Sequence, residues 1–534
     1  MVQVLGRDVS PVVVTAAFST ATAAVCYLTL RSRRRSRDEP PGPSFFIPFV
    51  GEMPAFASNP VKFVWDRYRR YNSSVFKSHL FGTRAYVVGD LEAIRGVLGS
   101  TENVESVIPI KAFSQIVSLY NTRGNVHRVF RKHMGLTLSP GNIKTNLPHF
   151  TQLVERHIES WVQSCERSPQ GEQAVSLCLD DAVRTLLLEL AVGPIMGLRT
   201  EPSQTAELLE LITTVQAGIF AAPIYIPGTT WYRAITSRPR YMAMLKQLLT
   251  RRFPVDQSTG QLQPSNDRGG MPGIDTTKAL MQEFKELQQT PTADDVAERL
   301  VQNMLGATET SYAQMWATIL VLAARPDVQE KVRQEQAALM KASGQEVTWE
   351  DLQTGMPYTD ACVREVARLV PSAHGVFRKA MKDLQVNGYT IPKGAPIIIT
   401  LDLLTAQDVV ATEKAQLSKG AKPEQKGVSE EELLGLNGFP VPLAMDHTAL
   451  QHSFQPERWL SEDKPRHLHV FSHGAHYCLG KDLAIMEIKL AVTYLARRCT
   501  WALDPPGNPI MTFVPFTRLA TGKPAMLRIT PNPL

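Results

Sequence analysis

The chain is organised around the stretch Phe471-Ser-His-Gly-Ala-His-Tyr-Cys-Leu-Gly480, close to its C-terminal end. Cys478 lies between two glycines, Gly474 and Gly480, and apolar residues recur at helical spacing in the segment 481–498 that follows. We therefore expect the cysteine just before a helix N-terminus, where the helix dipole and free backbone N–H groups favour a thiolate. The glycines allow the backbone to approach a flat ligand closely.

A thiolate held in this way suits a haem iron, because it donates electron density to the metal. Two other interpretations stay open from these residues alone. The cysteine is either a buried free thiol, the usual state of an isolated cysteine, or a zinc ligand together with His473 and His476.

The spacing Phe-x-x-Gly-x-His-x-Cys-x-Gly resembles the haem-binding signature of the cytochrome P450 family. The resemblance implies a mainly α fold with a small β region, haem b (iron protoporphyrin IX) as cofactor and Cys478 as the axial iron ligand. Phe471, Gly474 and Gly480 complete the signature. The family usually has arginine where this chain has His476, a position that the resemblance assigns to contact with a haem propionate.

The composition is that of an ordinary globular protein of 534 residues, 43% hydrophobic and 20% charged. Its six cysteines are widely spaced with no CxxC pair, which favours a reducing compartment over a disulfide framework. The net charge is +6, but residues 1–37 hold six Arg and one Asp and so carry +5 of it. The remaining chain is nearly neutral, so its charge gives no support to a nucleic-acid partner.

The N-terminal segment is expected to be a membrane-anchor helix. Residues 9–30 carry no charge and are long enough to cross a bilayer, and arginines follow from Arg31 to Arg37. By the positive-inside rule this cluster keeps the body on the cytosolic side, as in an endoplasmic reticulum protein. Residues 1–39 would form the anchor and basic linker, ahead of the stiff break Pro40-Pro-Gly-Pro43. A plastid transit peptide is the alternative, because the segment is rich in Ser, Thr, Ala and Arg.

A capping-box pattern, Thr292-Ala-Asp-Asp295, begins a segment without proline before Pro326, which predicts an unusually long helix. Within it, Gly306-Ala-Thr-Glu-Thr-Ser311 weakens the backbone ladder and allows a side chain or water to kink the helix. From the residues alone, an ordinary core helix with satisfied hydroxyls is the simpler interpretation. The six residues also match the P450 oxygen-activation motif, which implies that Glu309 and Thr310 pass protons to dioxygen at the iron.

Glu365 and Arg368 lie three residues apart on a predicted helix, 358–369, and can therefore pair. Such pairs are usually exposed and contribute little. Here they match the Glu-x-x-Arg of the P450 family, and Phe454-Gln-Pro-Glu-Arg-Trp459 matches the later segment that supplies a second arginine. The resemblance implies a buried network of Glu365, Arg368 and Arg458.

Three basic residues, His127, Arg131 and Arg378, match positions that contact the haem propionates in the family. The segment that carries His127 and Arg131 is amphipathic and basic, and from its residues alone it is a solvated helix face. By resemblance to the family's Trp-x-x-x-Arg pair both residues approach the haem, with histidine in place of tryptophan.

The substrate pocket is expected to be apolar. The apolar segment 211–232, interrupted by Pro223, Pro227 and Gly228, predicts a buried helix that ends in a loop, and by resemblance it falls where the family forms a mobile lid. Core packing explains apolar residues equally well. The candidate pocket residues are Val107, Ile110, Phe113, Ile116, Phe220, Met304, Val376 and Phe516.

Two hairpins are predicted, one over 75–88 and one over 386–394, from their alternation and their Gly-containing turns. Residues 254–273 are expected to be a surface loop. The segment 411–446, rich in Lys, Glu and Leu, departs from the family pattern and is expected to be a surface insertion in a catalytic domain of residues 40–534.

Residues 372–394 and 495–501 look most like the retinoic acid hydroxylases and the related plant oxidases of steroid and isoprenoid hormones. The expected activity is insertion of one oxygen atom from dioxygen into a C–H bond of a lipophilic isoprenoid, retinoid-like or sterol substrate. No G-x-G-x-x-G fingerprint opens a helix, so a separate NADPH-dependent flavoprotein reductase would supply electrons. The alternatives are a haem-thiolate isomerase or dehydratase that acts on a lipid peroxide without a reductase, and a non-catalytic haem sensor.

Overall fold

The computed structural model describes residues 2–4, 7–9, 38–43, 51–58, 60–80, 82–100, 102–107, 124–166, 174–219, 221, 223–263, 270–373, 375–401, 403–404, 407, 454–461, 468–474, 477–506, 511–512, 518–519 and 523–532. The predicted insertion at 411–446 lies outside the described residues.

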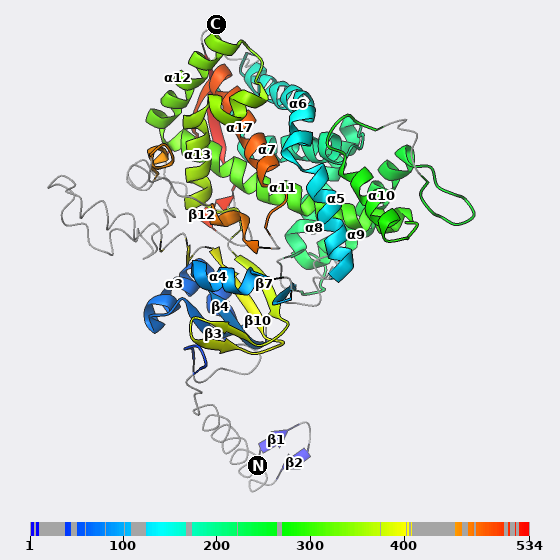
Figure 1. Ribbon diagram of the computed structural model, residues 1–534, viewed down its shortest axis with the longest axis vertical. Helices are drawn as coiled ribbons and strands as arrows, with labels where there is room; N and C mark the ends of the chain where they lie inside the picture. The colour runs from blue at the N-terminus through cyan, green and yellow to red at the C-terminus, as the bar shows by residue number, and fades with distance from the viewer. Residues whose placement is uncertain are drawn as a thin grey trace, which may run out of the picture.

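Helices make up most of the fold, and a small mixed sheet lies at one end of the helical body (Figure 1). This confirms the mainly α class with a small β region. The α-helices are α2 (Met53–Ser58), α3 (Pro60–Tyr71), α4 (Leu91–Leu98), α5 (Gly124–Thr137), α6 (Pro140–Glu166), α7 (Leu179–Leu190), α8 (Pro202–Ile219), α9 (Thr230–Arg252), α10 (Thr276–Glu286), α11 (Ala293–Ala324), α12 (Pro326–Ser343), α13 (Pro357–Leu369) and α17 (Lys481–Arg498).

The largest sheet has the strand order β3-β4-β10-β7-β5. Its strands are β3 (Val75–Leu80), β4 (Thr83–Val88), β5 (Val104–Ser106), β7 (Gly375–Ala380) and β10 (Pro396–Thr400). The β3–β4 pair is the first predicted hairpin, and β10 runs parallel to β4 but antiparallel to β7. Because Ile397 of β10 pairs with both Tyr86 of β4 and Arg378 of β7, segments far apart in sequence are fixed in register.

The structure also contains several smaller sheets. The second predicted hairpin is confirmed as a two-stranded pair, and a three-stranded sheet joins the C-terminus to the strand before α7. The strands of these sheets are β8 (Leu384–Val386), β9 (Tyr389–Ile391), β11 (Cys499–Leu503), β14 (Met526–Pro531), β6 (Val175–Cys178), β12 (Met511–Thr512) and β13 (Arg518–Leu519).

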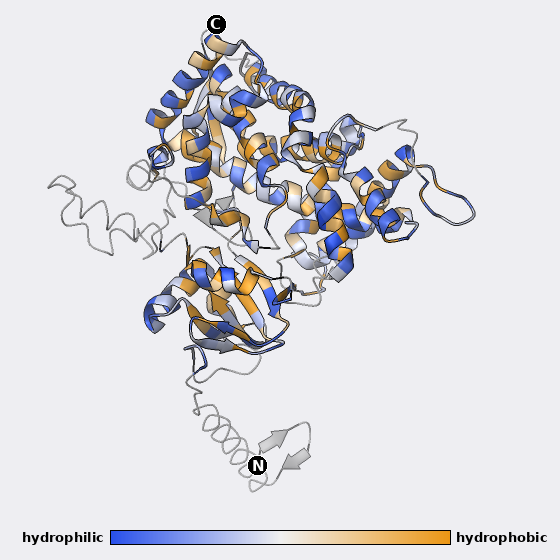
Figure 2. Cartoon of the chain, in the orientation of Figure 1, coloured by the Kyte–Doolittle hydropathy of each residue, from blue (hydrophilic) through white to orange (hydrophobic). Residues whose placement is uncertain are grey.

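The long predicted helix is confirmed as α11, which begins with a capping box between Thr292 and Asp295. Its first half packs in an apolar cluster with α8, α9 and α10, and its second half packs in another cluster with α6, α7, α13 and α17. The turn between Gly306 and Thr310 therefore lies where the two clusters meet. Strand β10, in the middle of the largest sheet, is strongly apolar, whereas outer helices such as α10 and α12 alternate between apolar and hydrophilic residues (Figure 2).

Near the N-terminus, β1 (Val2–Val4) pairs antiparallel with β2 (Arg7–Val9). Val9, the first residue of the predicted membrane span, thus lies in a strand and not in a helix, and residues 10–30 lie outside the described residues. None of the helices in the described part of the chain combines the length and the apolar character that crossing a membrane requires.

Candidate functional site

The loop before α17 presents Cys478 in a fixed backbone conformation. The Cys478 N–H donates to the Phe471 carbonyl oxygen at 2.9 Å, which closes the loop. Gly474 has φ +63°, and a Cβ built there would lie 2.2 Å from the Leu98 carbonyl oxygen at the end of α4. Glycine is therefore required at this position for both reasons. Gly480 is the N-cap residue of α17, so the cysteine precedes a helix as the sequence predicts.

The thiol of Cys478 is accessible, yet densely surrounded by protein. Burial raises its pKa, and the Gly480 N–H and the Arg131 and Lys481 charges lower it without fully offsetting burial. The helix N-terminus alone thus does not produce the expected thiolate, which a bound metal ion would produce by displacing the proton. Within the described ranges, no three His, Cys, Asp or Glu side chains are arranged to hold a metal ion, and His476 lies outside those ranges.

One face of α11 is accessible in the middle of an otherwise buried helix. Gly306 is exposed, and Ala307 and Thr310 are partly exposed, whereas Thr308 and Glu309 are buried. A Cβ built on Gly306 would meet no heavy atom within 4 Å. The Thr310 hydroxyl donates to the Gly306 carbonyl oxygen at 2.9 Å and so stays on this open face.

The cysteine loop, α5 and α11 approach the same region. Phe130 of α5, Ala307 of α11 and Leu479 all pack against one apolar cluster. A Cβ on Gly135 of α5 would lie 3.7 Å from Leu479. These contacts connect the residue after Cys478, helix α5 and the accessible face of α11 to one apolar cluster.

The predicted basic residues also lie together. Burial lowers the pKa of His127, and the Arg131 and Arg378 charges lower it further. Burial lowers the pKa of Arg131, and the Cys478 charge raises it by a smaller amount. Arg378 is buried, and its Nη1 donates to the Phe377 carbonyl oxygen at 2.8 Å.

No carboxylate in the described part of the chain contributes to the pKa of His127 or Arg131. An anionic group would pair favourably with Arg131 and Arg378, because a charge shielded from water is stabilised by a countercharge. The two propionates of a haem have this charge. The residues present therefore fit a haem, whose iron Cys478 would ligate and whose propionates His127, Arg131 and Arg378 would bind.

Glu309 is held by a charged network that comes from α7. Arg184 Nη1 donates to Glu309 Oε1 at 2.7 Å, and the Arg184 guanidinium lies 3.8 Å from the centre of the Tyr312 ring. The Tyr312 hydroxyl donates to Asp180 Oδ1 at 2.8 Å. A cavity of about 10 Å³, close to the size of one water molecule, adjoins Arg184, Glu309 and Tyr312.

Glu365 lies at the centre of a buried network, fully shielded from solvent. It accepts hydrogen bonds from Arg368 at 2.7 and 2.9 Å and from Trp459 Nε1 at 2.9 Å. Arg458 Nε lies 3.4 Å from Glu365 Oε1. The structure therefore brings together the three residues that the sequence predicts and adds the Trp459 indole.

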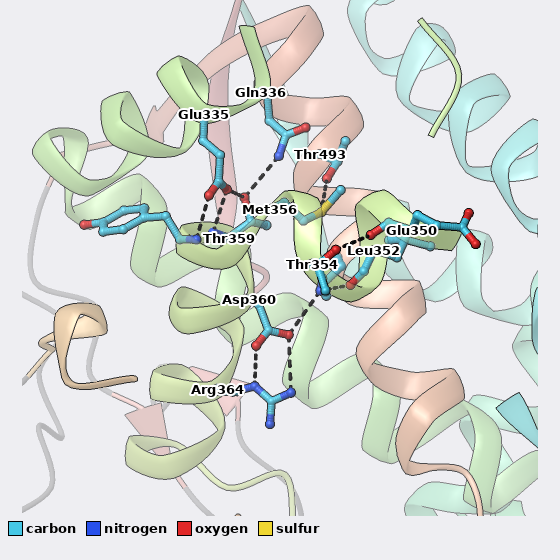
Figure 3. Close-up of polar contacts among 12 residues, drawn as sticks. Glu335, Gln336, Glu350, Leu352, Thr354, Met356, Thr359, Asp360, Arg364 and Thr493 are labelled. Atoms are coloured by element: carbon cyan, nitrogen blue, oxygen red, sulfur yellow. Dashed lines mark hydrogen bonds and ion pairs between the residues drawn. The ribbon is translucent and has the colours of Figure 1, made fainter. Parts of the chain in front are cut away.

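The start of α13 is fixed to its neighbours, which positions Glu365 farther along the helix. Glu335 of α12 accepts from the Thr359 N–H at 2.8 Å and from the Thr359 hydroxyl at 2.6 Å (Figure 3). Asp360 accepts from Arg364 and, at 3.1 Å, from Lys489 of α17. Helix α13 is thereby bound to both α12 and α17 before it reaches the Glu365 network.

Few of the predicted pocket residues can be placed. Met304 is buried in α11, and Val107 and Val376 are partly buried beside the largest sheet. The predicted site residues that lie outside the described residues are Ile110, Phe113, Ile116, Phe220, His476 and Phe516.

Sequence reasoning missed one charged residue that contacts the oxygen-activation motif. Arg184 pairs with Glu309. No motif in the sequence marks Arg184.

The sequence matches the cytochrome P450 family over residues 40–408 and 452–527, most of the chain. The chain therefore belongs to the cytochrome P450 family, whose members are haem-thiolate oxidoreductases, and this confirms the resemblance found in its motifs.

Similar proteins include taxoid 14-beta-hydroxylase from Taxus cuspidata, 28% identical with 90% of this chain and 86% of that protein covered. Cytochrome P450 26C1 from Mus musculus is 24% identical, with 89% of this chain and 86% of that protein covered. Abscisic acid 8'-hydroxylase 1 from Arabidopsis thaliana is 23% identical, covering 92% of each.

Among solved structures, cyanobacterial CYP120A1 with retinoic acid bound superposes with a TM-score of 0.71 at 22% identity. The superposition covers 93% of this chain and all of that one. At this identity the likeness establishes the fold.

Proposed function

We propose that this P450 monooxygenase hydroxylates a lipophilic isoprenoid, retinoid-like or sterol substrate with dioxygen and electrons from an NADPH-dependent flavoprotein reductase. The observation that carries the proposal is the open face of α11, where Thr310 bonds to Gly306, while Ala307 of this face and Leu479, the residue after Cys478, pack against one apolar cluster. The haem, when bound, supplies the iron centre at which dioxygen is reduced.

In this proposal Cys478 would ligate the haem iron. Arg131 and Arg378 would neutralise the propionates, and His127 and His476 would contact them. Phe471, Gly474 and Gly480 shape the loop, and the hydrogen bond from Cys478 N–H to Phe471 keeps the sulfur in place. The network of Glu365 supports the fold behind this loop.

Thr310 and Glu309 have different roles in proton transfer. The Thr310 hydroxyl is on the accessible face and can hold a proton donor near the oxygen. Glu309 is buried and bonded to Arg184 beside a cavity about the size of one water molecule, so it can exchange protons with water that enters there.

The substrate class rests on the names of similar proteins. These include hydroxylases of taxoids and of abscisic acid and a beta-amyrin 28-monooxygenase from Panax ginseng. The apolar pocket candidates Met304 and Val376 are consistent with such substrates.

An isomerase or dehydratase acting on a lipid peroxide needs neither a reductase nor a proton relay, and a haem sensor needs no turnover. Incubation with NADPH, dioxygen and a purified P450 reductase separates these functions. Product that carries one atom of labelled dioxygen supports the monooxygenase. Peroxide rearrangement without NADPH would establish the isomerase, and a bound haem with neither reaction would establish the sensor.

A panel of retinoids, sterols and carotenoid fragments tests the substrate class through the shift of the haem absorption band on binding. Only the hydroxylated compounds define the substrate. If none of these compounds shifts the band or is oxidised, the proposed class is wrong.

We further propose that residues 1–39 anchor the protein in the endoplasmic reticulum membrane with the catalytic domain in the cytosol. Support comes from the uncharged stretch 9–30 and the arginines after it. Deleting residues 1–37 would release the protein from membranes and keep its haem spectrum. A native N-terminus cleaved within this segment would favour the plastid alternative.

A further inference from the structure

A pocket of about 150 Å³ lies between α13, α17 and the one-turn π-helix η4 (Asp351–Gly355) that precedes α13. Its lining includes none of the residues assigned above to the haem, to the Glu365 network or to oxygen activation. One wall is apolar and includes Trp349, Ile485 and Met486, and the other wall is charged. The pocket is therefore a separate space with an apolar side and a polar side.

Lys489 of α17 ties the walls of this pocket together. Its side chain is 4% exposed, and its Nζ donates to Asp360 Oδ1 of α13 at 3.1 Å and to the Leu352 carbonyl oxygen of η4. An ammonium has three N–H donors, so one remains for a ligand. The turn η4 is held at its start as well, because the Asp351 N–H donates to Thr348 Oγ1 at 3.1 Å. The pocket is thus largely preorganised, which lowers the cost of binding.

Arg364 and Lys481 add donors that are not used within the protein. Arg364 donates through Nε and Nη2 to Asp360 (Figure 3), which leaves its Nη1 without an acceptor among the described residues. The Lys481 Nζ lies 5.9 Å from the centre of the Tyr477 ring. No carboxylate in the described part of the chain forms an ion pair with Lys481. Both side chains line the pocket and can therefore donate to a ligand.

Cations outnumber carboxylates around the pocket. Arg364, Lys481 and Lys489 face only Asp360 and Asp482. Asp360 already accepts from Arg364 and Lys489, and Asp482 is exposed to solvent. Burial lowers the pKa of Lys489, and the Asp360 charge and hydrogen bond offset this only in part. A monoanion in the pocket would balance the surplus positive charge.

The volume and the apolar wall restrict the kind of anion. A cavity of about 150 Å³ holds one benzene molecule. Trp349 packs against the core and presents an apolar surface beside Met486. A carboxylate pairs with a guanidinium through two parallel N–H···O bonds. Phosphate would satisfy the charges but would leave the apolar wall in contact with water.

We propose that this pocket binds a small apolar monocarboxylate of the size of benzoate, with its carboxylate between Arg364 and Lys481 and its apolar body against Trp349. The ligand connects α13 to the first turn of α17, the helix that follows the cysteine loop. It therefore stabilises the folded protein by mass action. Binding requires neither a reductase nor turnover, so this site is independent of the proposed function.

Calorimetric titration of the haem-loaded, full-length protein with benzoate tests the site. One saturable binding event per chain is expected. Benzyl alcohol has the ring without the charge, and acetate has the charge without the ring, so each should bind at least about 10-fold more weakly. Inorganic phosphate should also bind at least about 10-fold more weakly. Equal affinity for benzoate and for acetate or phosphate would overturn the assignment to an apolar acid.

Three variants locate the binding event. Arg364→Gln should weaken benzoate binding at least about 10-fold. Arg333→Gln is its matched control and should bind as the wild type does, because Arg333 is 33% exposed against 32% for Arg364 and also pairs with an acid on its own helix, Glu330. Ile485→Phe fills the pocket and removes no ion pair, so it should weaken binding at least about 10-fold with an unchanged melting temperature, even if Arg364→Gln folds poorly.

The haem absorption band separates this pocket from the predicted substrate pocket. Benzoate bound near the iron would shift the band and would bind equally well to all three variants. Benzoate bound beside Arg364 should leave the band unchanged. Unaltered affinity in Arg364→Gln and Ile485→Phe, or no saturable binding to the wild type, would overturn the proposal. The proposed function is tested separately, by turnover with a reductase, which this titration does not involve.

Discussion

Arg184 of α7 donates to Glu309 of α11 at 2.7 Å, so the acidic residue of the oxygen-activation motif is one half of an ion pair. Burial lowers the pKa of Arg184, but the charge and hydrogen bond of Glu309 and the charges of Tyr312 and Asp180 together raise it by more, which keeps the guanidinium charged. Arg184 in turn lies over the Tyr312 ring, one turn along α11. Arg184 therefore fixes the position of the Glu309 carboxylate, from which Glu309 would transfer protons in the proposed function.

We expect Arg184→Gln to destabilise the fold by about 1–3 kcal/mol, less than a fully buried pair, because Arg184 is partly exposed. The stability falls because the Glu309 carboxylate is left without its cationic partner. Urea unfolding measures the loss, and the double variant with Glu309→Gln should recover part of it. Arg156→Gln is the control, since Arg156 pairs with Glu189 at a more exposed position. Equal losses for the two arginine variants would show that burial of the Glu309 pair has no energetic effect.

Removal of the Glu365 charge should unfold the region behind the cysteine loop. Burial raises the pKa of Glu365, but the hydrogen bonds and charges of Arg368 and Arg458 and the Trp459 bond lower it by more, so the net shift is downward. We expect Glu365→Ala to cost about 3–5 kcal/mol at neutral pH, because the buried Arg368 and the partly buried Arg458 lose their partner. Haem content and the melting temperature measure the effect. Glu457→Ala, an exposed carboxylate in the adjacent segment, should keep both near the wild-type values.

The same shift predicts the pH dependence of this network. Since the folded-state pKa of Glu365 is below its unfolded value, its stabilising effect is complete above the unfolded pKa near 4.5. The effect is lost as pH falls through the folded-state pKa. The stability difference between the wild type and Glu365→Gln should therefore shrink below about pH 4. A difference that stays constant down to the acid transition would contradict this assignment.

Arg131 should be required for haem retention. The guanidinium is half-buried near His127 and Cys478, without a carboxylate that shifts its pKa, so a bound propionate would gain a partly desolvated charge partner. We expect Arg131→Leu to lose haem at least about 10-fold faster to apomyoglobin. Lys132→Leu is the neighbouring control, because Lys132 is exposed and pairs with Glu286 at 2.7 Å. Equal rates of haem loss in the two variants would remove Arg131 from the haem site.

Cys478 should be the only thiolate on the iron. Among the described cysteines it is the exposed one, whereas Cys362 and Cys499 are buried in the apolar core. The reduced carbon monoxide complex of Cys478→Ala should lack the thiolate Soret band, and Cys499→Ala should keep it. An unchanged band in Cys478→Ala would reassign the ligand.

Local patterns in the sequence were sufficient to predict much of this structure. The capping box at Thr292, the unbroken run to Pro326 and the Gly-bounded cysteine loop each depend on neighbouring residues, and the structure has α11 and α17 where they indicate. The partner Arg184 could not be found in this way. It meets Glu309 across the contact between α7 and α11, and such pairing depends on packing rather than on spacing.

The pKa of Cys478 illustrates the same limit. The sequence indicates the helix N-terminus and hence a thiolate, but the net shift depends on how much protein surrounds the sulfur. Burial outweighs the favourable N–H group and charges, and the pKa rises. Desolvation is a property of the whole fold, which local residues do not reveal.

The last prediction concerns Thr310, whose hydroxyl lies on the open face of α11 and donates to Gly306. Thr310→Ala removes the hydroxyl and keeps the helix, because alanine is the better helix former. A monooxygenase needs ordered proton delivery to the oxygen that it reduces, so the variant should divert electrons from product to hydrogen peroxide. We expect product per NADPH to fall about 5-fold or more, with haem content unchanged. Thr308→Ala is the matched control on the same helix, because Thr308 is buried and donates to Met304 at 2.7 Å. It should lose stability without a comparable change in coupling. If the two variants couple alike, Thr310 is a core hydroxyl, and the argument for oxygen activation on this face of α11 does not hold.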